Sequence, residues 1–519
     1  MNFSYIKRIL YISLTLLLNK ISYSQNESFL MTQIGSDFLL NKPFDLHYGP
    51  DDYLWVTEKN GVVVRINPIN GQRDELITLS DISFGGNQDG LLGMAFHNEF
   101  KTGSPYVYLS YTHKVSGQNK QKLVRYTYNI NQDNGYLSSP LVIFDNLPSS
   151  DDHQSGRLIF GPDKKLYHTI GDQAVKVCAS NLAQFLPTQE EINQQNWQNY
   201  PGKILRLNLD GSIPEDNPIL NGVKSHVYSY GHRNPQGLVY GSNGILYSDE
   251  HGPSSDDEIN IINSGKNYGW PYVAGLKDNL VYDSDGCHAN ETSFTEANYQ
   301  DPIISLFPPN SEKDPNCTNS WMCRPNIAPS SIAFYKGEGI PNWKNSLLIT
   351  SLKRGKIYRV QLNEEGTSVI GNPTAYFYTT NRYRDIAIDP DGKSIYVITD
   401  ESGKTADESG MNIETTLQHP GAILKFTYQE SMSVNQIEND HFLKIWQHAT
   451  QRVLYIDIKD GNNHDFNAEL INSMGQVVMR FSNLEMGINQ RQIEGITPGF
   501  YILNLKEKNN FWKKRVFLH

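Results

Sequence analysis

The stretch that decides the fold reads IAIDPDGKSIYVITD, from Ile386 to Asp400. An apolar run, a turn rich in Pro, Asp and Gly, and a second apolar run are typical of a β-hairpin. The arrangement recurs as LIFGPDKKLYHTIGD from Leu158 and as LVYGSNGILYSDE from Leu238. Further copies begin at Leu46, Met94 and Ile332. The chain therefore carries six copies of one strand pair.

A third apolar strand follows each copy, and in five of the six copies a basic residue recurs in the interior of this strand. The basic residues are Arg65, Arg125, Arg206, Arg359 and Lys425. The fourth copy differs, with DEINIIN in this place. Three or four short strands that recur along a chain indicate a β-propeller, because radial repetition leaves only short, protected edges. We predict an all-β fold with a six-bladed β-propeller over residues 28–430; a β-sandwich followed by irregular segments is the alternative.

The composition excludes several classes of protein. The 519 residues are 38% hydrophobic, 11% aromatic and only 19% charged, which is too aromatic for a disordered chain. A net charge of −11 argues against a general nucleic-acid binder. Beyond the extreme N-terminus no run of 18 apolar residues exists, so no other segment is expected to span a membrane.

The N-terminus has the features of a secretory signal peptide. Lys7 and Arg8 precede an apolar run over 9–18, and small residues follow before Gln25. We predict a signal peptide over residues 1–24 rather than a membrane anchor, and hence a secreted or cell-surface protein. Export makes disulfides possible. Cys317 and Cys323 are close enough for a local bond, whereas Cys178 and Cys287 either pair across loops or stay free.

The last part of the chain has a different sequence pattern. Residues 431–519 alternate polar and apolar residues in short runs, which predicts a small separate β-sandwich. The ordered set INSMGQVV, GITPGFYILNL and KKRVFLH resembles the C-terminal sorting domain of the type IX secretion system. The resemblance implies passage across the outer membrane through that machinery. An ordinary adhesive sandwich module is the alternative.

Polar residues gather where the third hairpin opens and closes. His153 comes just before its first strand and Asp172 just after its second. The two ends of a hairpin lie side by side, so we expect Asp172 to reach His153 and to fix the orientation of its ring. His153 then becomes a candidate general base, since an imidazole can exchange a proton near neutral pH. A solvated loop histidine is the alternative.

The fourth hairpin repeats this placement with different chemistry. His232, Arg233 and Asn234 precede its first strand, and HGPSSDDE follows its second. Carboxylates and backbone carbonyls are the ligands that calcium prefers. The segment from Gly252 to Glu258 is therefore a candidate calcium site, with an exposed acidic turn as the alternative.

Basic residues collect at corresponding positions of the last two hairpins: Lys353, Arg354, Arg382 and Arg384. In an acidic chain, cations that face one channel call for an anionic partner. Arginine binds carboxylate or phosphate with two parallel hydrogen bonds, and lysine acts as a point charge. We therefore expect an anionic ligand at this place.

These segments together resemble a known family. From Phe38 to Tyr428 the chain is similar to the soluble sugar dehydrogenases that use pyrroloquinoline quinone (PQQ), the glucose/sorbosone dehydrogenase-like six-bladed propellers. The matching strings include QDGLLGMAFH, DDHQSGRLIFGPD, TIGDQ, GKILRLNLDGSIPEDNP, YGHRNPQGL, GPSSDDEIN, NYGWPYVAGLKD, SLKRG and NRYRD. The resemblance implies a PQQ- and calcium-dependent oxidoreductase that converts an aldose to a lactone and passes electrons to an external acceptor.

The resemblance also implies a role for each matching residue. His153 would take the proton of the anomeric hydroxyl, Asp172 would hold the imidazole, and Arg233 would stabilise negative charge on the quinone. The other cofactor-binding residues would be Asn234, Trp321, Asn326, Lys353, Arg382 and Arg384. The carbonyls of Gly252 and Pro253 would bind the calcium ion that meets PQQ. A second calcium would involve Ala274, Leu276, Asp278 and Glu291.

At the substrate end the chain departs from the family. Gln88 and Asp152 would contact the sugar, but CTNSWMCRPNIAPSS offers Trp321 and Arg324 where the glucose-oxidising members carry a Tyr and a Trp. Arg324 replaces an aromatic wall with a charge, which suggests an acidic or larger saccharide. Two other functions stay open: a calcium-dependent lactonase on a similar scaffold, and a non-catalytic propeller that binds carbohydrate or protein.

Overall fold

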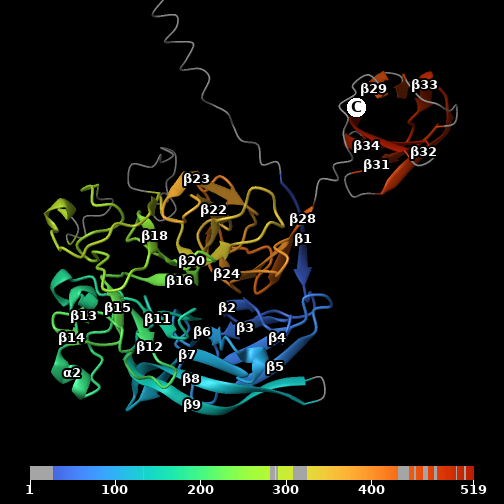
Figure 1. Ribbon diagram of the computed structural model, residues 1–519. Coiled ribbons are helices and arrows are strands. Elements are labelled where there is room, and N and C mark those ends of the chain that lie inside the picture. The colour runs from blue at the N-terminus through green and yellow to red at the C-terminus, as the bar shows by residue number, and fades with distance from the viewer. Residues whose placement is uncertain are drawn as a thin grey trace, which may run out of the picture. The chain divides into compact units, whose positions relative to one another are not determined.

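The computed structural model of the protein describes residues 27–131, 134–280, 287, 290–307, 324–429, 443–448, 452–459, 466–472, 476–497, 499–507 and 510–518. The chain divides into two units between Gln429 and Glu430 (Figure 1). Across the described residues, no helix has the length and apolar character needed to cross a membrane. The signal peptide predicted over 1–24 lies outside the described residues.

Within its described residues the first unit contains six four-stranded antiparallel sheets, and in five of them the strands follow chain order. The first three sheets are β2 (Pro43–Tyr48), β3 (Leu54–Glu58), β4 (Val62–Ile66), β5 (Arg73–Thr78); β6 (Leu91–Phe96), β7 (Tyr106–Val115), β8 (Gln118–Asn131), β9 (Asn134–Pro148); and β10 (Ser155–Phe160), β11 (Leu166–Ile170), β12 (Lys203–Leu207), β15 (Val227–Tyr230). The next two are β16 (Pro235–Tyr240), β17 (Leu246–Glu250), β18 (Asp257–Ile261), β19 (Ile304–Leu306); and β20 (Pro329–Tyr335), β21 (Ser346–Ser351), β22 (Ile357–Leu362), β23 (Val369–Tyr376).

The sixth sheet joins the two ends of the unit. It consists of β24 (Tyr383–Ile388), β25 (Ser394–Thr399), β28 (Ile423–Gln429) and β1 (Ser28–Ile34). In Figure 1 the blue β1 lies beside the orange β28, and the two pair antiparallel from Ser28 opposite Gln429 to Ile34 opposite Ile423. Minor elements are β13 (Ile219–Leu220), β14 (Val223–Lys224), β26 (Thr405–Ala406), β27 (Ile413–Glu414) and α2 (Gln189–Asn193).

The core consists of the layers between consecutive sheets. The first strand of each sheet contacts the first strand of the next, and β24 contacts β2, so the sheets form a closed ring. Each layer mixes residues of two neighbouring sheets: Trp55 packs with Leu109, for example, and Tyr335 with Ile395. Tyr396 of the last sheet packs with Leu54 of the first, which closes the apolar core around the ring.

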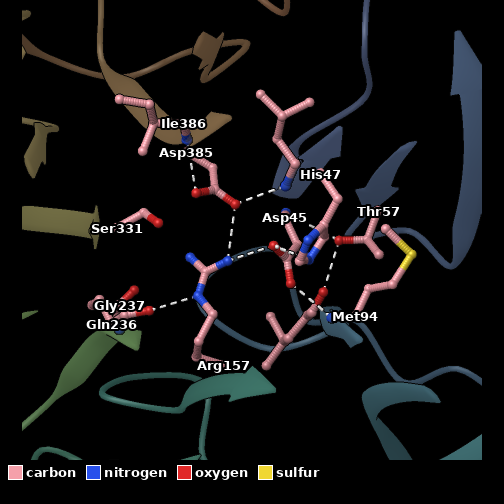
Figure 2. Close-up of polar contacts among 12 residues, drawn as sticks. Asp45, His47, Thr57, Met94, Arg157, Gln236, Gly237, Ser331, Asp385 and Ile386 are labelled. Carbon is pink, nitrogen blue, oxygen red and sulfur yellow. Dashed lines mark hydrogen bonds and ion pairs between the residues drawn. The ribbon is translucent and has the colours of Figure 1, made fainter. Parts of the chain in front are cut away.

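A buried arginine joins the sheets at the centre of the ring. Figure 2 shows the guanidinium of Arg157, from β10, between the carboxylates of Asp45 and Asp385, from β2 and β24. Its Nη1 lies 2.6 Å from Asp45 Oδ1 and 2.9 Å from Asp385 Oδ2. Arg157 also donates to the carbonyls of Gln236 in β16 and Ser330 in β20, at 2.9 and 3.2 Å.

The first strand of the second sheet, β6, joins this group through its backbone. Asp45 Oδ2 accepts a hydrogen bond from the backbone N–H of Met94 in β6 at 2.7 Å. All these contacts lie near the start of a first strand, so the six first strands begin at the same end of the ring. We call this end the site end. Irregular pairing recurs there in all six sheets, between Pro43 and Asp45 in the first and between Tyr383 and Asp385 in the last. Such bulges re-aim side chains locally.

The repeated basic residue of the third strands has a structural explanation. Each lies over an aromatic ring of its own sheet or of the hairpin turn within that sheet, for example Arg125 over Tyr106 and Arg65 over Tyr53, both at 4.1 Å from the ring centroid. The further pairs are Arg206 over Tyr167, Arg359 over Trp343 and Lys425 over Tyr396. Cation–π attraction therefore accounts for the pattern.

The second unit contains two antiparallel sheets in its described residues. One consists of β29 (Leu443–His448), β30 (Val453–Ile458) and β33 (Gly487–Gln492), and the other of β32 (Val477–Leu484), β31 (Phe466–Ile471), β34 (Gly499–Glu507) and β35 (Asn510–Leu518). Both sheets contribute to one apolar core, in which Leu454 and Ile456 of the first meet Leu470 and Leu503 of the second.

The Arg157 contacts predict a large effect on stability. An Arg157→Met substitution leaves the Asp385 carboxylate buried without its cation and Asp45 with only His47, 3.2 Å away. Removing one partner of a buried ion pair costs about 3–5 kcal/mol in comparable cases. We expect the urea midpoint of the first unit's unfolding to fall accordingly. The matched control is Lys344→Met, which breaks the exposed ion pair with Glu338 and should leave the curve unchanged. Equal urea midpoints for Arg157→Met and Lys344→Met would contradict the structural role of Arg157.

Candidate active site

His153 and Asp172 meet at the site end, where the third hairpin opens and closes. His153 Nδ1 lies 2.6 Å from Asp172 Oδ1, the contact expected from the sequence. The backbone around it is tight, because a Cβ on Gly171 would lie 2.0 Å from the carbonyl oxygen of His153. His153 itself has a φ of +42°, a conformation that is costly for a residue other than glycine. The hairpin ends therefore hold the imidazole in one place.

The Asp172 carboxylate is held from several sides. Its Oδ2 accepts hydrogen bonds from Trp270 Nε1 at 2.7 Å and Asn181 Nδ2 at 2.9 Å. Burial opposes ionisation of this carboxyl, but the hydrogen bond and charge of His153, together with the charge of Arg233, outweigh it and lower the pKa of Asp172. An ionised Asp172 accepts from Nδ1–H of His153. This leaves Nε2 as the ring nitrogen that can take up a proton.

Arg233 and Asn234 lie beside this pair. The guanidinium of Arg233 lies 5.3 Å from the ring centroid of Trp270, and its Nη1 donates to the carbonyl of His251 at 3.2 Å. The backbone N–H of Arg233 donates to Glu250 Oε2 at 2.9 Å. Burial lowers the pKa of Arg233. Asn234 is fully buried, and its Oδ1 accepts from Ser155 Oγ at 3.0 Å.

Two donors of these residues have no acceptor. Arg233 Nε and Asn234 Nδ2 are buried and make no hydrogen bond within the described chain. Burying a polar group without a partner costs free energy, so such groups call for an explanation. A ligand with acceptor oxygens, such as a quinone carboxylate, fits both atoms.

The cations of the last two sheets also lie at the site end, and an internal anion already binds two of them. Arg382 Nε and Arg384 Nε both bind the Asp400 carboxylate, at 2.9 and 2.8 Å. The charges of the two arginines overcome burial and lower the pKa of Asp400. Asp400 is thus an internal counter-anion that the sequence did not indicate. One carboxylate against two guanidinium groups still leaves one positive charge.

Lys353 lies in the turn between β21 and β22 of the neighbouring sheet. Its Nζ donates to Asn326 Oδ1 at 2.9 Å and to the carbonyl of Arg324 at 2.5 Å. Burial, together with the charge of Arg354, lowers the pKa of Lys353 to about 7, against the opposing charge of Asp257. Its charge at neutral pH therefore depends on what binds near it.

Of the residues predicted to meet the sugar, Gln88 and Asp152 lie together. Gln88 Nε2 donates to Asp152 Oδ1 at 2.5 Å, and the backbone N–H of His153 donates to the same oxygen at 2.9 Å. This holds the Asp152 carboxylate against the backbone of His153, with Gln88 bound to it. Arg324 is half-buried beside Lys353. Trp321, like Cys317 and Cys323, lies outside the described residues.

The acidic run after β17 is not an exposed turn, so that alternative is wrong. Asp256, Asp257 and Glu258 are 5%, 0% and 7% exposed. Burial raises the pKa of Asp257 to about 7, and its Oδ2 accepts from the backbone of Ile327 at 2.6 Å. Its Oδ1 accepts from the N–H of Gly252 at 2.9 Å. These carboxyl groups hold the loops that carry the predicted calcium ligands.

The predicted calcium ligands fall in two places. A Cβ on Gly252 would lie 1.8 Å from the carbonyl oxygen of Ser255, so only glycine fits in this turn next to Pro253. The second set forms one loop around Glu291, whose oxygens accept from the N–H groups of Ala274 at 3.0 Å and Asp278 at 3.3 Å. Leu276 is exposed. Within the described residues no cluster of three His, Cys, Asp or Glu side chains could hold a metal ion.

Sequence reasoning missed several residues that hold the site. Trp270 and Asn181 fix Asp172, Glu250 fixes the backbone of Arg233, and Asp400 pairs the two arginines. Trp270 stands in the string NYGWPYVAGLKD, but nothing local connects it to a carboxylate 98 positions away. The pairing that the sequence left open is a disulfide between Cys178 and Cys287, with a Cα–Cα distance of 5.6 Å.

The lowered pKa of Asp172 predicts a pH-dependent contribution to stability. A carboxyl group whose pKa is lower in the folded state stabilises the fold above its ordinary value of 3.8, and the contribution is lost as the pH falls through the folded pKa. The unfolding free energy of the wild type should exceed that of Asp172→Asn near neutral pH, and the difference should shrink in acid. Urea titrations from pH 7 down to pH 3 measure this. A difference that stays constant over that range would contradict the prediction.

Comparisons with known proteins identify the family of the chain. The profile described as glucose/sorbosone dehydrogenase matches residues 40–407. The chain is 42% identical over 431 residues to quinoprotein glucose dehydrogenase B of Acinetobacter calcoaceticus, covering 75% of this chain and 89% of that protein. It is 28% identical over 369 residues to an aldose sugar dehydrogenase of Escherichia coli, covering 70% and 88%.

A solved structure is also similar. The PQQ-bound aldose sugar dehydrogenase from Streptomyces coelicolor matches with a TM-score of 0.56 and 25% identity, over 78% of this chain and 99% of that one. The family profile covers more than half of the chain, including the His153–Asp172 pair and the Arg382–Arg384 pair. The chain therefore belongs to the glucose/sorbosone dehydrogenase family.

Proposed function

We propose that the protein is a PQQ-dependent aldose dehydrogenase that oxidises the anomeric carbon of a sugar to a lactone and passes the electrons to an external acceptor. One observation carries the proposal: an oriented imidazole, His153, lies beside the buried, unpaired donors of Arg233 and Asn234. A base next to unsatisfied donors is what oxidation of an alcohol by a quinone requires. The relative from Acinetobacter, a quinoprotein glucose dehydrogenase, supports it.

The residues of this chain act on the sugar as follows. Gln88 and Asp152 bind and orient the sugar next to the ring of His153. His153 Nε2 takes the proton of the anomeric hydroxyl, and the Asp172 carboxylate stabilises the imidazolium that forms. The buried guanidinium of Arg233 stabilises negative charge on an oxygen that develops nearby, which is electrostatic preorganisation.

The cofactor-binding residues surround these groups. Asn234, Asn326, Lys353, Arg382 and Arg384 would hold PQQ, with Trp321 as a predicted stacking residue. PQQ supplies a two-electron acceptor for the hydride of the anomeric carbon. Calcium at the carbonyls of Gly252 and Pro253 would add a Lewis acid. The second calcium set, which includes Asp278 and Glu291, belongs to the proposal as well.

The wider proposal concerns fold and location. We infer that the six sheets are the blades of a β-propeller and that residues 431–519 form a β-sandwich that serves as a type IX sorting domain. With the signal peptide over 1–24, this makes the protein a secreted or cell-surface enzyme. The ring closed by β1 and β28 supports the first inference. The separate core of the second unit supports the second.

A reconstitution assay tests the proposed activity. Purified protein with PQQ and calcium should reduce an artificial electron acceptor when given an aldose, and the panel should include neutral aldoses, uronic acids and disaccharides. His153→Ala removes the base and should lower kcat by about 10²–10⁴. The panel also tests whether Arg324 favours an acidic sugar.

Two outcomes would contradict the proposal. Turnover of a lactone without PQQ would assign a calcium-dependent lactonase to this scaffold. Absence of PQQ-dependent turnover on every sugar, with intact binding of carbohydrate in His153→Ala, would assign a binding protein. Lys336→Met, at the opposite end of β20, is the matched control and should leave kcat unchanged.

A further inference from the structure

Lys59 is a buried cation that the proposed mechanism does not use. It lies in the turn between β3 and β4, at the site end of the first sheet, and is 6% exposed. Its Nζ donates one hydrogen bond, to the carbonyl of Asn87 at 3.0 Å. An ammonium group has three donors. The Lys59 ammonium thus makes a single hydrogen bond and no ion pair within the described chain, and its other contact is with the ring of Phe44, 5.8 Å from the centroid.

The charged groups around Lys59 do not balance its positive charge. The charges that act most strongly on Lys59 are those of Arg384, Asp400, Arg382 and Asp89. Asp400 is already shared by the two arginines, and Asp89, which is fully buried, accepts from the N–H of Gly85 at 2.6 Å. Three cations therefore face two carboxylates, and neither carboxylate pairs with Lys59. Buried charges are ordinarily paired, so an anion is missing here.

We propose that Lys59 binds a carboxylate of PQQ, as a further cofactor-binding residue from the first sheet. The inference rests on the proposed function and extends it. PQQ carries three carboxylates. Lys353 supplies one positive charge. Arg382, Arg384 and Lys59 together supply one more after Asp400 and Asp89 are counted, and without Lys59 this group would be neutral.

The protonation of Lys59 gives a second measurable consequence of PQQ binding. Burial, with the charge of Arg384, lowers the pKa of Lys59 to about 7, against the charge of Asp400. At pH 8 most Lys59 side chains would be neutral in the empty protein. An anion that binds next to Nζ favours the charged form, so binding takes up a proton. Lys353, whose pKa is also about 7, contributes in the same direction, so Lys59 accounts for part of the uptake.

Calorimetric titration of the apoprotein with PQQ at pH 8, in buffers of different ionisation enthalpy, measures affinity and proton uptake together. Lys59→Met should weaken binding roughly 10- to 100-fold, the effect of losing a hydrogen bond to a charged group, and should reduce proton uptake. Lys59→Arg keeps the charge and should retain most of the affinity. Lys336→Met, which removes the same charge from the other end of the ring, should match the wild type.

Thermal unfolding of the apoprotein separates binding from folding. Because Lys59 is buried with one hydrogen bond, Lys59→Met should unfold at the wild-type temperature or above it. Wild-type PQQ affinity and proton uptake in Lys59→Met would overturn the inference while leaving the proposed function intact. A destabilised Lys59→Met apoprotein with unchanged proton uptake would also overturn it, because the role would be structural. A wild-type protein that binds no PQQ would overturn both.

Discussion

The fold depends on one buried cation. Arg157 binds Asp45 and Asp385, which come from the first and last sheets, and donates to the backbones of two more. Through Asp45 it also reaches β6, so a single guanidinium connects the first strands of all six sheets. Beyond Arg157, away from the site end, lies a cavity of about 610 Å³ lined by residues of the same strands. The Arg157 contacts thus form the floor between this cavity and the site.

The same contacts position the chemistry. His153, Arg233 and Arg382 all lie just before the start of a first strand, within a few residues of the Arg157 contacts. A ring that fixes the starts of these strands also fixes the loops in front of them. This is how groups from different sheets become preorganised around one ligand, the condition under which electrostatic stabilisation is strongest.

The sheets and the contact between His153 and Asp172 could be predicted from the sequence, for physical reasons. Six hairpins with turn residues and alternating apolar strands predict the sheets, and the hairpin geometry brings His153 to Asp172. The rest depends on partners that are remote in the chain. Trp270 binds Asp172 across 98 positions, and Arg157 binds Asp385 across 228. No local pattern marks these pairs. The burial of Asp256, Asp257 and Glu258 was missed because an acidic run ordinarily lies in solvent, whereas here backbone N–H groups and side-chain donors satisfy it.

The most direct measurement follows the absorbance of protein-bound PQQ after mixing with an aldose that carries either hydrogen or deuterium at its anomeric carbon. The account predicts one equivalent of cofactor reduced per protein, at a rate that falls several-fold with deuterium. Bound PQQ whose spectrum does not respond to any aldose would contradict the claim that this end of the ring joins a base to a quinone.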